Sequence, residues 1–295
     1  MTLSTPWAMR QVFLPKSFME ATVVLGSIQK PSQVSWFATG FIVGRYEGVD
    51  EKGQKKYTTY LVTNKHVVEG QTSLQMQFNS ANGISINTTT LKKGRLRLYS
   101  VHPDPEVDII ANRININGAM ENGAIVSFFQ LDDHALEKAS MKQTGVEVGS
   151  LVYSLGFPVS LANDLVDSIN KAPVCRLGCV SRIEHLYHNN NAKFYIIDAP
   201  VYPGNSGGPI INRPEMISIQ GTPVNSTAKL IGIVSAYIPY RENLMSTQTG
   251  RIRMVNEENS GLTVVFPVDD IKEVDERERT RSTGLQSGQK MEGLN

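Results

Sequence analysis

The stretch YPGNSGGPII, from Tyr202 to Ile211, places one serine among residues that favour sharp turns. Gly, Asn and Pro occur where the backbone adopts conformations that other residues resist, so the stretch predicts a specified turn before a buried strand. A serine hydroxyl is a weak nucleophile until a base removes its proton, and that base works better when a carboxylate holds it. Ser206 therefore raises the question of a histidine and an acid elsewhere in the chain.

The chain has five histidines, and His66 stands out among them by its surroundings. It ends an apolar run in YLVTNKHVVEG and has apolar residues on both sides, which predicts a rigidly held position. His134, His185 and His188 lie in polar stretches. A core histidine with satisfied hydrogen bonds is the alternative interpretation of His66.

Two aspartates compete for the role of the acid. Asp108, in HPDPEVDIIANRI, stands at the start of an apolar strand, whereas Asp104 lies in the Pro-rich turn before it. Burial at a strand start favours Asp108, and Asp104 remains the alternative. His66, Asp108 and Ser206 follow one another at separations of 42 and 98 residues. Such a set would let Ser206 attack an acyl group while His66 takes its proton and Asp108 orients the imidazole.

The motifs TNKHVV, VDIIANRI and PGNSGGPI occur in the order His, Asp, Ser, and in this the chain resembles the trypsin-like (chymotrypsin-fold) serine proteases. It is most similar to their disulfide-free HtrA/Deg branch, because the resemblance continues in VEVGSLVYSLGFPVS, GCVSRI and IIDAPVYPGNSGGPIIN. The resemblance covers residues 20 to 275, and the PDZ domain usual in that branch is not expected in the remainder.

The resemblance implies how the turn around Ser206 works. The amides of Gly204 and Ser206 point together into an oxyanion hole, and Gly207 and Gly208 leave room for substrate and packing. Thr39, in FATGFIV, resembles a residue on the leaving-group side. The turn is then shaped to aim two backbone donors at the developing negative charge.

The stretch LIGIVSAYI resembles the strand beside the primary specificity pocket. The resemblance implies that Ser235 supports Asp108 and that the backbone of Ser235, Ala236 and Tyr237 pairs with the substrate as an added strand. Pro200 stands six positions before the nucleophile, where a trypsin carries its pocket aspartate, so the counter-charge for Lys or Arg is missing. We therefore expect an extended peptide substrate with an aliphatic or other uncharged side chain in the pocket.

Asn205 precedes the nucleophile, at the position where secreted trypsins carry an aspartate that pairs with a newly cut N-terminus. The resemblance therefore implies that this zymogen route is absent. We expect control through loop ordering by an activating protein partner or by the substrate instead.

These features favour a serine endopeptidase that forms an acyl-enzyme on a polypeptide substrate and needs no metal or organic cofactor. The alternative is a catalytically idle trypsin-like domain that acts as a peptide-binding or regulatory module. An esterase with the same triad is a third possibility, and it would cleave small esters but no polypeptide.

Short β-rich runs separated by Gly, Asn, Asp and Pro clusters predict an all-β fold, with two antiparallel β-barrels in the chymotrypsin-like arrangement. Val268, Ile271 and Val274 recur at helical spacing and predict a C-terminal helix, whose charge run we interpret as a solvated face. The predicted divisions are an N-terminal extension (1–19), first barrel (20–135), connector (136–147), second barrel (148–267), helix (268–282) and mobile tail (283–295).

Composition narrows the partners and the compartment. The 29 Lys and Arg nearly balance the 28 Asp and Glu, without a basic stripe, which argues against nucleic acid as a partner. No run approaches the roughly 20 apolar residues of a membrane helix, and the first residues lack a signal-peptide core, so we expect no membrane association. Two cysteines are too few for a disulfide framework and favour a reducing cytoplasm.

The pair Cys175 and Cys179, with His185 and His188, forms C-x3-C-x5-H-x2-H and suggests zinc. On one strand, residues four apart have Cα atoms about 13 Å apart, too far for one metal or a disulfide unless the intervening RLG forms a turn. We therefore expect ordinary reduced cysteines and no metal site.

Overall fold

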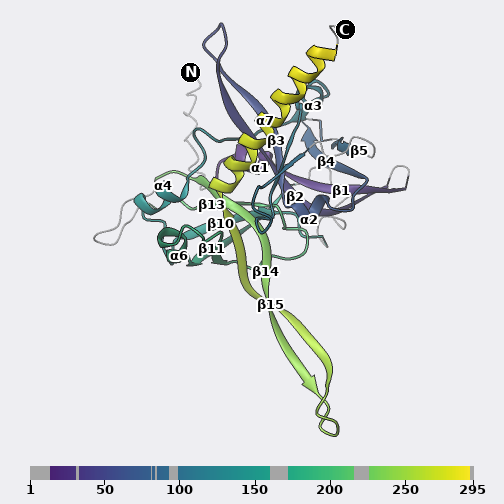
Figure 1. The fold of residues 1–295 in the computed structure, drawn as a ribbon, viewed down its shortest axis with the longest axis vertical. Helices are drawn as coiled ribbons and strands as arrows, with labels where there is room; N and C mark the ends of the chain where they lie inside the picture. The colour runs from purple at the N-terminus through teal and green to yellow at the C-terminus, as the bar shows by residue number, and fades with distance from the viewer. Residues whose placement is uncertain are drawn as a thin grey trace, which may run out of the picture.

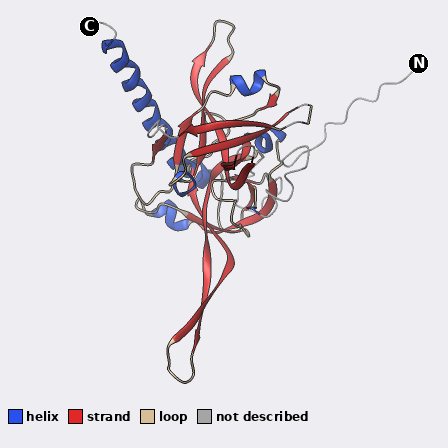
Figure 2. Cartoon of the chain, turned by 90° about the vertical axis from the view of Figure 1, so that its right-hand side faces the viewer, coloured by secondary structure: helices blue, strands red, loops and turns tan. Residues whose placement is uncertain are grey.

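The computed structural model describes residues 14–30, 33–80, 82–83, 85–92, 99–159, 172–215 and 226–292. Strands dominate, and the chain forms two halves with a sheet each, joined by a connector and followed by a long helix (Figures 1 and 2). The predicted all-β fold class is confirmed, because the halves form a nine-stranded sheet and a closed six-stranded barrel, an arrangement consistent with the predicted chymotrypsin-like double barrel.

The first half carries a nine-stranded sheet in the order β5-β4-β1-β2-β3-β7-β6, with β8 paired to β4 and β9 paired to β2. Its elements are α1 (Lys16–Ala21), β1 (Thr22–Lys30), β2 (Gln33–Val49), β3 (Lys55–Thr63), α2 (Lys65–Val68), β4 (Ser73–Ser80), β5 (Ile86–Lys92), β6 (Tyr99–Val101), β7 (Ile110–Arg113), α3 (Asn117–Glu121), β8 (Ala124–Ile125) and β9 (Phe129–Gln130).

The second half is a closed barrel in the order β10-β11-β12-β15-β14-β13. Helix α4 (Lys138–Gln143) lies in the predicted connector. The other elements are β10 (Leu151–Gly156), β11 (Val174–Arg182), α6 (Glu184–His188), β12 (Tyr195–Asp198), β13 (Pro209–Asn212), β14 (Lys229–Met245), β15 (Ile252–Pro267) and α7 (Val268–Glu292).

Strands become more apolar toward the interior of each half. Strand β3 is exposed at Lys55 and Lys56, near its hairpin with β2, and buried from Thr59 to Thr63, where it approaches the other half. Each half has an apolar core of its own, and a third cluster joins them. This joining cluster includes Phe41 and Val62 from the first half with Leu230 and Ile233 from the second.

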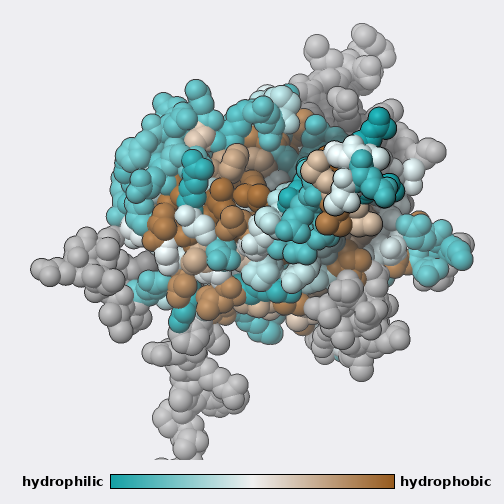
Figure 3. All heavy atoms as spheres, turned by 90° about the horizontal axis from the view of Figure 1, so that it is seen from below, coloured by the Kyte–Doolittle hydropathy of each residue, from teal (hydrophilic) through white to brown (hydrophobic). Residues whose placement is uncertain are grey.

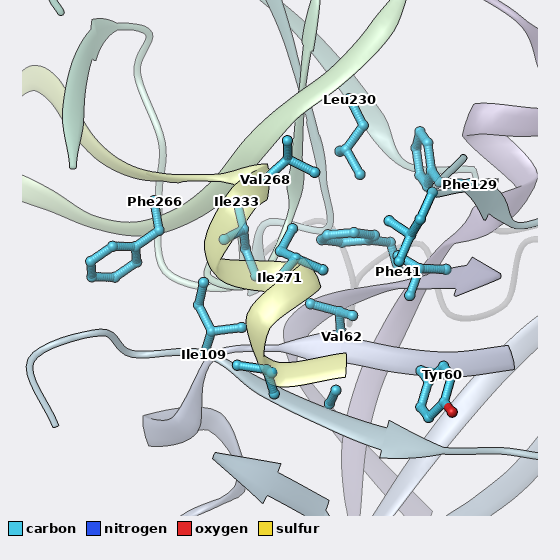
Figure 4. Packing of buried hydrophobic residues seen from close by; sticks show 14 of the residues in the cluster. Phe41, Tyr60, Val62, Ile109, Phe129, Leu230, Ile233, Phe266, Val268 and Ile271 are labelled. Atoms are coloured by element: carbon cyan, nitrogen blue, oxygen red, sulfur yellow. The ribbon is translucent and has the colours of Figure 1, made fainter. Parts of the chain in front are cut away.

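Helix α7 fills the space between the halves. Val268, Ile271 and Val274 are fully buried, at the spacing that the sequence predicts, and belong to the joining cluster. Figure 4 shows Val268 and Ile271 between side chains of both halves. The interpretation of the charge run as a solvated face is wrong for Asp275 and Glu278, which are buried.

The buried acids of α7 bind the first half. Asp275 accepts hydrogen bonds from Arg45 on β2 at 3.4 Å, and Glu278 accepts one from the Ser100 hydroxyl of β6 at 2.5 Å. Polar contacts therefore fix the helix against the first half beyond its apolar stripe.

The helix is longer than the sequence suggests. It continues to Glu292 instead of ending at residue 282, so ten residues of the predicted mobile tail are helical, and residues 293–295 lie outside the described part. Within the described residues, no helix has an apolar stretch long enough to cross a bilayer.

Replacement of Ile271 by alanine should lower the free energy of unfolding by about 2–5 kcal/mol, because Ile271 is fully buried between the halves and leaves a cavity. Urea unfolding of the Ile271→Ala protein measures this change. Glu276→Ala, on the exposed face of α7, is the matched control and should change stability by less than about 0.5 kcal/mol. Equal stability of the two variants would contradict a contribution of the buried α7 stripe to the packing of the two halves.

Candidate active site

His66 and Asp108 meet at the edge of the first half. Strand β3 ends at Thr63, and His66 lies on the one-turn helix α2 that follows it. Its ring Nδ1 is 2.5 Å from Asp108 Oδ2, and its backbone amide donates to Asp108 Oδ1 at 3.0 Å. The carboxylate therefore holds both the ring and the main chain of His66.

Asp108 is fixed in turn by the residues before His66. The Asn64 side-chain amide donates to the Asp108 carbonyl oxygen at 2.8 Å, and the Lys65 amide contacts the same oxygen at 3.4 Å. The alternative acid, Asp104, instead pairs with Lys193 at 2.7 Å. The structure thus brings Asp108 to His66 and leaves Asp104 in another ion pair.

The contact with Asp108 changes the chemistry of the His66 ring. The hydrogen bond to Asp108 raises the pKa of His66 above its ordinary value, against the opposing effect of burial. A carboxylate at Nδ1 favours the tautomer with its proton on Nδ1, which leaves Nε2 free to accept another proton. Half of the His66 side chain is exposed, so a substrate can reach it.

Ser206 lies in the turn between β12 and β13 and is partly exposed. Gly204 has φ +101° and Gly207 has φ +82°, a region where other residues are strained. A Cβ at Gly204 would collide with the Phe157 carbonyl oxygen, and a Cβ at Gly208 would collide with that of Leu155. Both the conformation and the packing of the turn therefore require glycine.

The turn leaves two backbone donors unused. The amide of Asn205 donates to Tyr202 O at 2.9 Å, and that of Gly207 donates to Val234 O at 3.0 Å. Among the described residues, the amides of Gly204 and Ser206 have no hydrogen-bond acceptor. Both amides can therefore donate to a group that binds at the turn.

Thr39 on β2 fastens this turn to the first half. Its hydroxyl donates to Gly204 O at 2.6 Å and accepts from Phe157 N at 2.9 Å, while its amide donates to Ser206 O at 3.1 Å. The Thr63 hydroxyl, on β3, donates to Thr39 O at 2.8 Å. The sequence pointed to Thr39 by resemblance, but the hydrogen bonds of Asn64 and Thr63 had no signal in it.

Two expected contacts are not formed in the described structure. Ser206 Oγ makes no hydrogen bond to His66, and Ser235, although buried, makes none to Asp108. Catalytic hydrogen bonds are often long or poorly aligned before substrate binds, so the first observation is compatible with a resting site.

The predicted substrate edge is open. Strand β13 pairs with β14 from Pro209 to Asn212, and its last partner on β14 is Ile233. Beyond Val234, that edge of β14 carries no strand among the described residues, so Ser235, Ala236 and Tyr237 can pair with a peptide. Ala236 and Pro200 are exposed, and neither supplies a charge to a pocket.

The cysteines lie where the strand interpretation puts them. Cys175 and Cys179 are both on β11, and His185 and His188 are on α6. The described residues contain no group of three or more His, Cys, Asp or Glu side chains that could hold a metal ion.

Residues 38–215, more than half of the chain, match the family model for a trypsin-like peptidase domain. The chain belongs to the trypsin-like peptidase family. The resemblance of the chain to that family is thus confirmed. No curated protein gives a significant sequence match.

Solved structures similar to this trypsin-like peptidase have low identity to it. They include the HtrA-type protease AlgW with decapeptide (18% identity, TM-score 0.48, covering 87% of this chain and 64% of that one). The MamO protease domain from Magnetospirillum magneticum, apo form, has 16% identity and a TM-score of 0.45, and the match covers 87% of this chain and 96% of that one. The serine endoprotease from Yersinia pestis has 17% identity and a TM-score of 0.45, and the match covers 90% of this chain and 67% of that one. This chain therefore spans less than two thirds of the AlgW chain.

Replacement of Thr39 by valine should slow acylation of Ser206 about 10²-fold, because Gly204 O loses the donor that orients its peptide beside the oxyanion site. Stopped-flow acylation by a small ester measures the rate. The Thr59→Val control loses a similar hydrogen bond, to Ile114 O at 2.9 Å, away from the turn. If both variants lose stability but acylate equally fast, Thr39 has a structural role alone.

Proposed function

We propose that this trypsin-like peptidase is a serine endopeptidase in which His66, Asp108 and Ser206 form the catalytic triad. The observation that carries the proposal is the 2.5 Å contact between His66 Nδ1 and Asp108 Oδ2. A carboxylate held at this nitrogen is the arrangement that orients a general base and stabilises its protonated form.

The proposed steps use these groups in order. Ser206 Oγ attacks the carbonyl carbon of a peptide bond while His66 Nε2 takes its proton. The Gly204 and Ser206 amides donate to the oxyanion of the tetrahedral intermediate. His66 then protonates the leaving amine, which yields an acyl-enzyme on Ser206. A water, deprotonated by His66, releases the acid product and restores the serine.

The open edge of β14 supports a polypeptide substrate. An extended peptide that pairs with Ser235, Ala236 and Tyr237 places its backbone alongside the nucleophile turn, because Val234 is hydrogen-bonded to that turn through Gly207 and Gly208. With Pro200 at the expected pocket position, an uncharged side chain before the scissile bond is favoured over Lys or Arg.

The second candidate is a catalytically idle domain that binds peptides. The missing hydrogen bond between Ser206 and His66 favours it, since an unassembled triad can still present the β14 edge.

The same missing hydrogen bond fits an endopeptidase at rest. A protein partner that brings Ser206 and His66 together would convert this resting state into the active enzyme.

Wild-type protein should react with a fluorophosphonate probe at Ser206, while Ser206→Ala should remove the labelling and His66→Ala should slow it about 10⁴-fold or more. Labelling is read by in-gel fluorescence and mass spectrometry of the modified peptide. Ser181→Ala, on β11, is the matched control and should react as wild type. Wild-type protein that stays unlabelled, alone and in cell lysate, would favour the idle domain.

The rate of acylation should rise with pH through a midpoint above about 6.5, because protonated His66 cannot accept a proton and Asp108 raises its pKa. Asp108→Asn should move this midpoint down and lower the rate about 10⁴-fold. Single-turnover acylation measured from pH 5 to 9 tests both effects.

The control for this experiment is Asp104→Asn, which removes the competing acid and its ion pair with Lys193. Its midpoint should match that of the wild type. A shift in Asp104→Asn together with an unchanged midpoint in Asp108→Asn would reverse the assignment of the acid.

A further inference from the structure

Strands β14 and β15 continue past the second barrel as a two-stranded ribbon, residues 240–258, which stands away from the body (Figures 1 and 2). Barrel pairing of β14 with β13 ends at Ile233, and that of β15 with β12 ends at Leu262. The ribbon is therefore not required for closure of the barrel.

Large apolar side chains are exposed along this ribbon. More than half of the surface of each is exposed: Tyr240 53%, Leu244 52%, Met245 61%, Ile252 55%, Met254 61% and Val255 53%. Leu244 pairs with Met254, and the adjacent pair is Asn243 with Val255, so both faces near the tip carry apolar groups. Such clustering on an element outside the core indicates an interaction surface.

The ribbon continues the edge proposed to hold the substrate. The amide and carbonyl of Val234 are hydrogen-bonded to the nucleophile turn, through Gly208 O and Gly207 N. From Ser235 to Met245, the same edge of β14 has no partner strand among the described residues. At about 3.4 Å a residue, this edge offers about 34 Å of strand leading away from Ser206, with backbone donors and acceptors interrupted only at Pro239, which has no N–H.

Polar contacts hold the base of the ribbon. Glu257 accepts hydrogen bonds from the Tyr237 hydroxyl at 3.1 Å and from Arg241 Nε at 2.9 Å. The Asn259 amide donates to Val201 O at 2.5 Å, which ties the base to the segment before the nucleophile. These contacts fix the direction of the ribbon relative to Ser206.

The chemistry of the ribbon indicates what binds there. Residues 240–258 contain three arginines and three glutamates, so the ribbon has no net charge to select an acidic or basic ligand. Exposed apolar side chains and unpaired backbone groups instead favour an extended, apolar segment of chain. Seen from the side to which the ribbon points, apolar residues also gather in the middle of the body (Figure 3).

We propose that the ribbon is an extended substrate-binding arm, along which an unfolded polypeptide adds as an antiparallel strand to β14 from Ser235 to Met245. The antiparallel direction follows the second barrel, whose strand pairs are all antiparallel. Residues before the scissile bond then run outward, and those about eight to ten positions before it reach the apolar tip. The inference rests on the proposed function, since it takes Ser206 as the site of cleavage.

The first test measures binding without cleavage. In Ser206→Ala protein, fluorescence anisotropy gives the Kd of fluorescein-labelled β-casein, an unfolded polypeptide. One variant, the short-ribbon protein, replaces residues 240–258 by Asn-Gly, which closes the hairpin at the Pro239 and Asn259 pair. A second, Leu244→Ser with Met254→Ser, keeps the ribbon and removes apolar side chains that are already exposed.

Both ribbon variants should raise the Kd at least tenfold. Val49→Ser, which removes a side chain 59% exposed on β2 in the other half, is the matched control and should leave the Kd unchanged. Casein binding that is equal in all variants would overturn the proposal.

The second test measures cleavage in proteins that retain Ser206. Two peptides share one casein cleavage site and begin four or twelve residues before it. Wild type should favour the longer peptide at least tenfold in kcat/KM, and the short-ribbon protein should cleave both at the slower rate. Fluorophosphonate labelling of both proteins shows whether Ser206 is reactive. If neither reacts, the proposed function fails, and the anisotropy result still decides whether the ribbon binds polypeptide.

A second copy of the chain is the other occupant to distinguish. Analytical ultracentrifugation of the wild-type and short-ribbon proteins distinguishes a ribbon that binds substrate from one that binds a second copy. A dimer that dissociates when the ribbon is shortened, with unchanged casein binding, would assign the ribbon to self-association and overturn the proposal.

Discussion

The hydrogen bonds of Thr39 join the two halves at the nucleophile turn. Ser206 and the free amides of that turn belong to the second barrel, whereas His66 and Asp108 belong to the first sheet. Thr39 donates to Ser206 O and to Gly204 O, and these two hydrogen bonds fix the position of the turn relative to β2. The proposed triad would need its groups placed to well within 1 Å, so the position of one half on the other has to be fixed closely.

Helix α7 supports that alignment, at an electrostatic cost. Its apolar stripe joins both halves, but burial raises the pKa of Asp270 to about 7 and that of Asp275 to about 6. An acid whose pKa is raised in the folded state binds protons more tightly there than in the unfolded chain. The two aspartates therefore cost little at low pH. As the pH rises from about 4 through their folded-state pKa values, they oppose the docking of α7. The proposed role of His66 requires the opposite change, because a general base acts only after it has lost its proton.

The candidate site residues could be proposed from the sequence, whereas the distant contacts that hold the surrounding elements in place could not. His66, Asp108 and Ser206 stand in motifs whose order and local pattern point to one another, and the apolar stripe of α7 follows from its spacing. Buried charges on α7 could not be predicted, because Asp275 is paired with Arg45, 230 residues away. Local pattern cannot distinguish a solvated charge from one buried against a distant partner.

The ribbon shows the same limit at the level of strands. The sequence of β14 reads as one strand near the pocket, and nothing local tells where the barrel ends and the ribbon begins. That boundary depends on where β12 and β13 stop. It matters because β15, just after the ribbon, braces the segment before Ser206: Gly261 O accepts from Ala199 N at 3.0 Å, and the Thr263 hydroxyl donates to Ala199 O at 2.9 Å. In the proposed binding mode, a polypeptide along β14 lies on a hairpin whose other strand, β15, contacts the segment before Ser206, so the length of a bound chain has a physical connection to that turn.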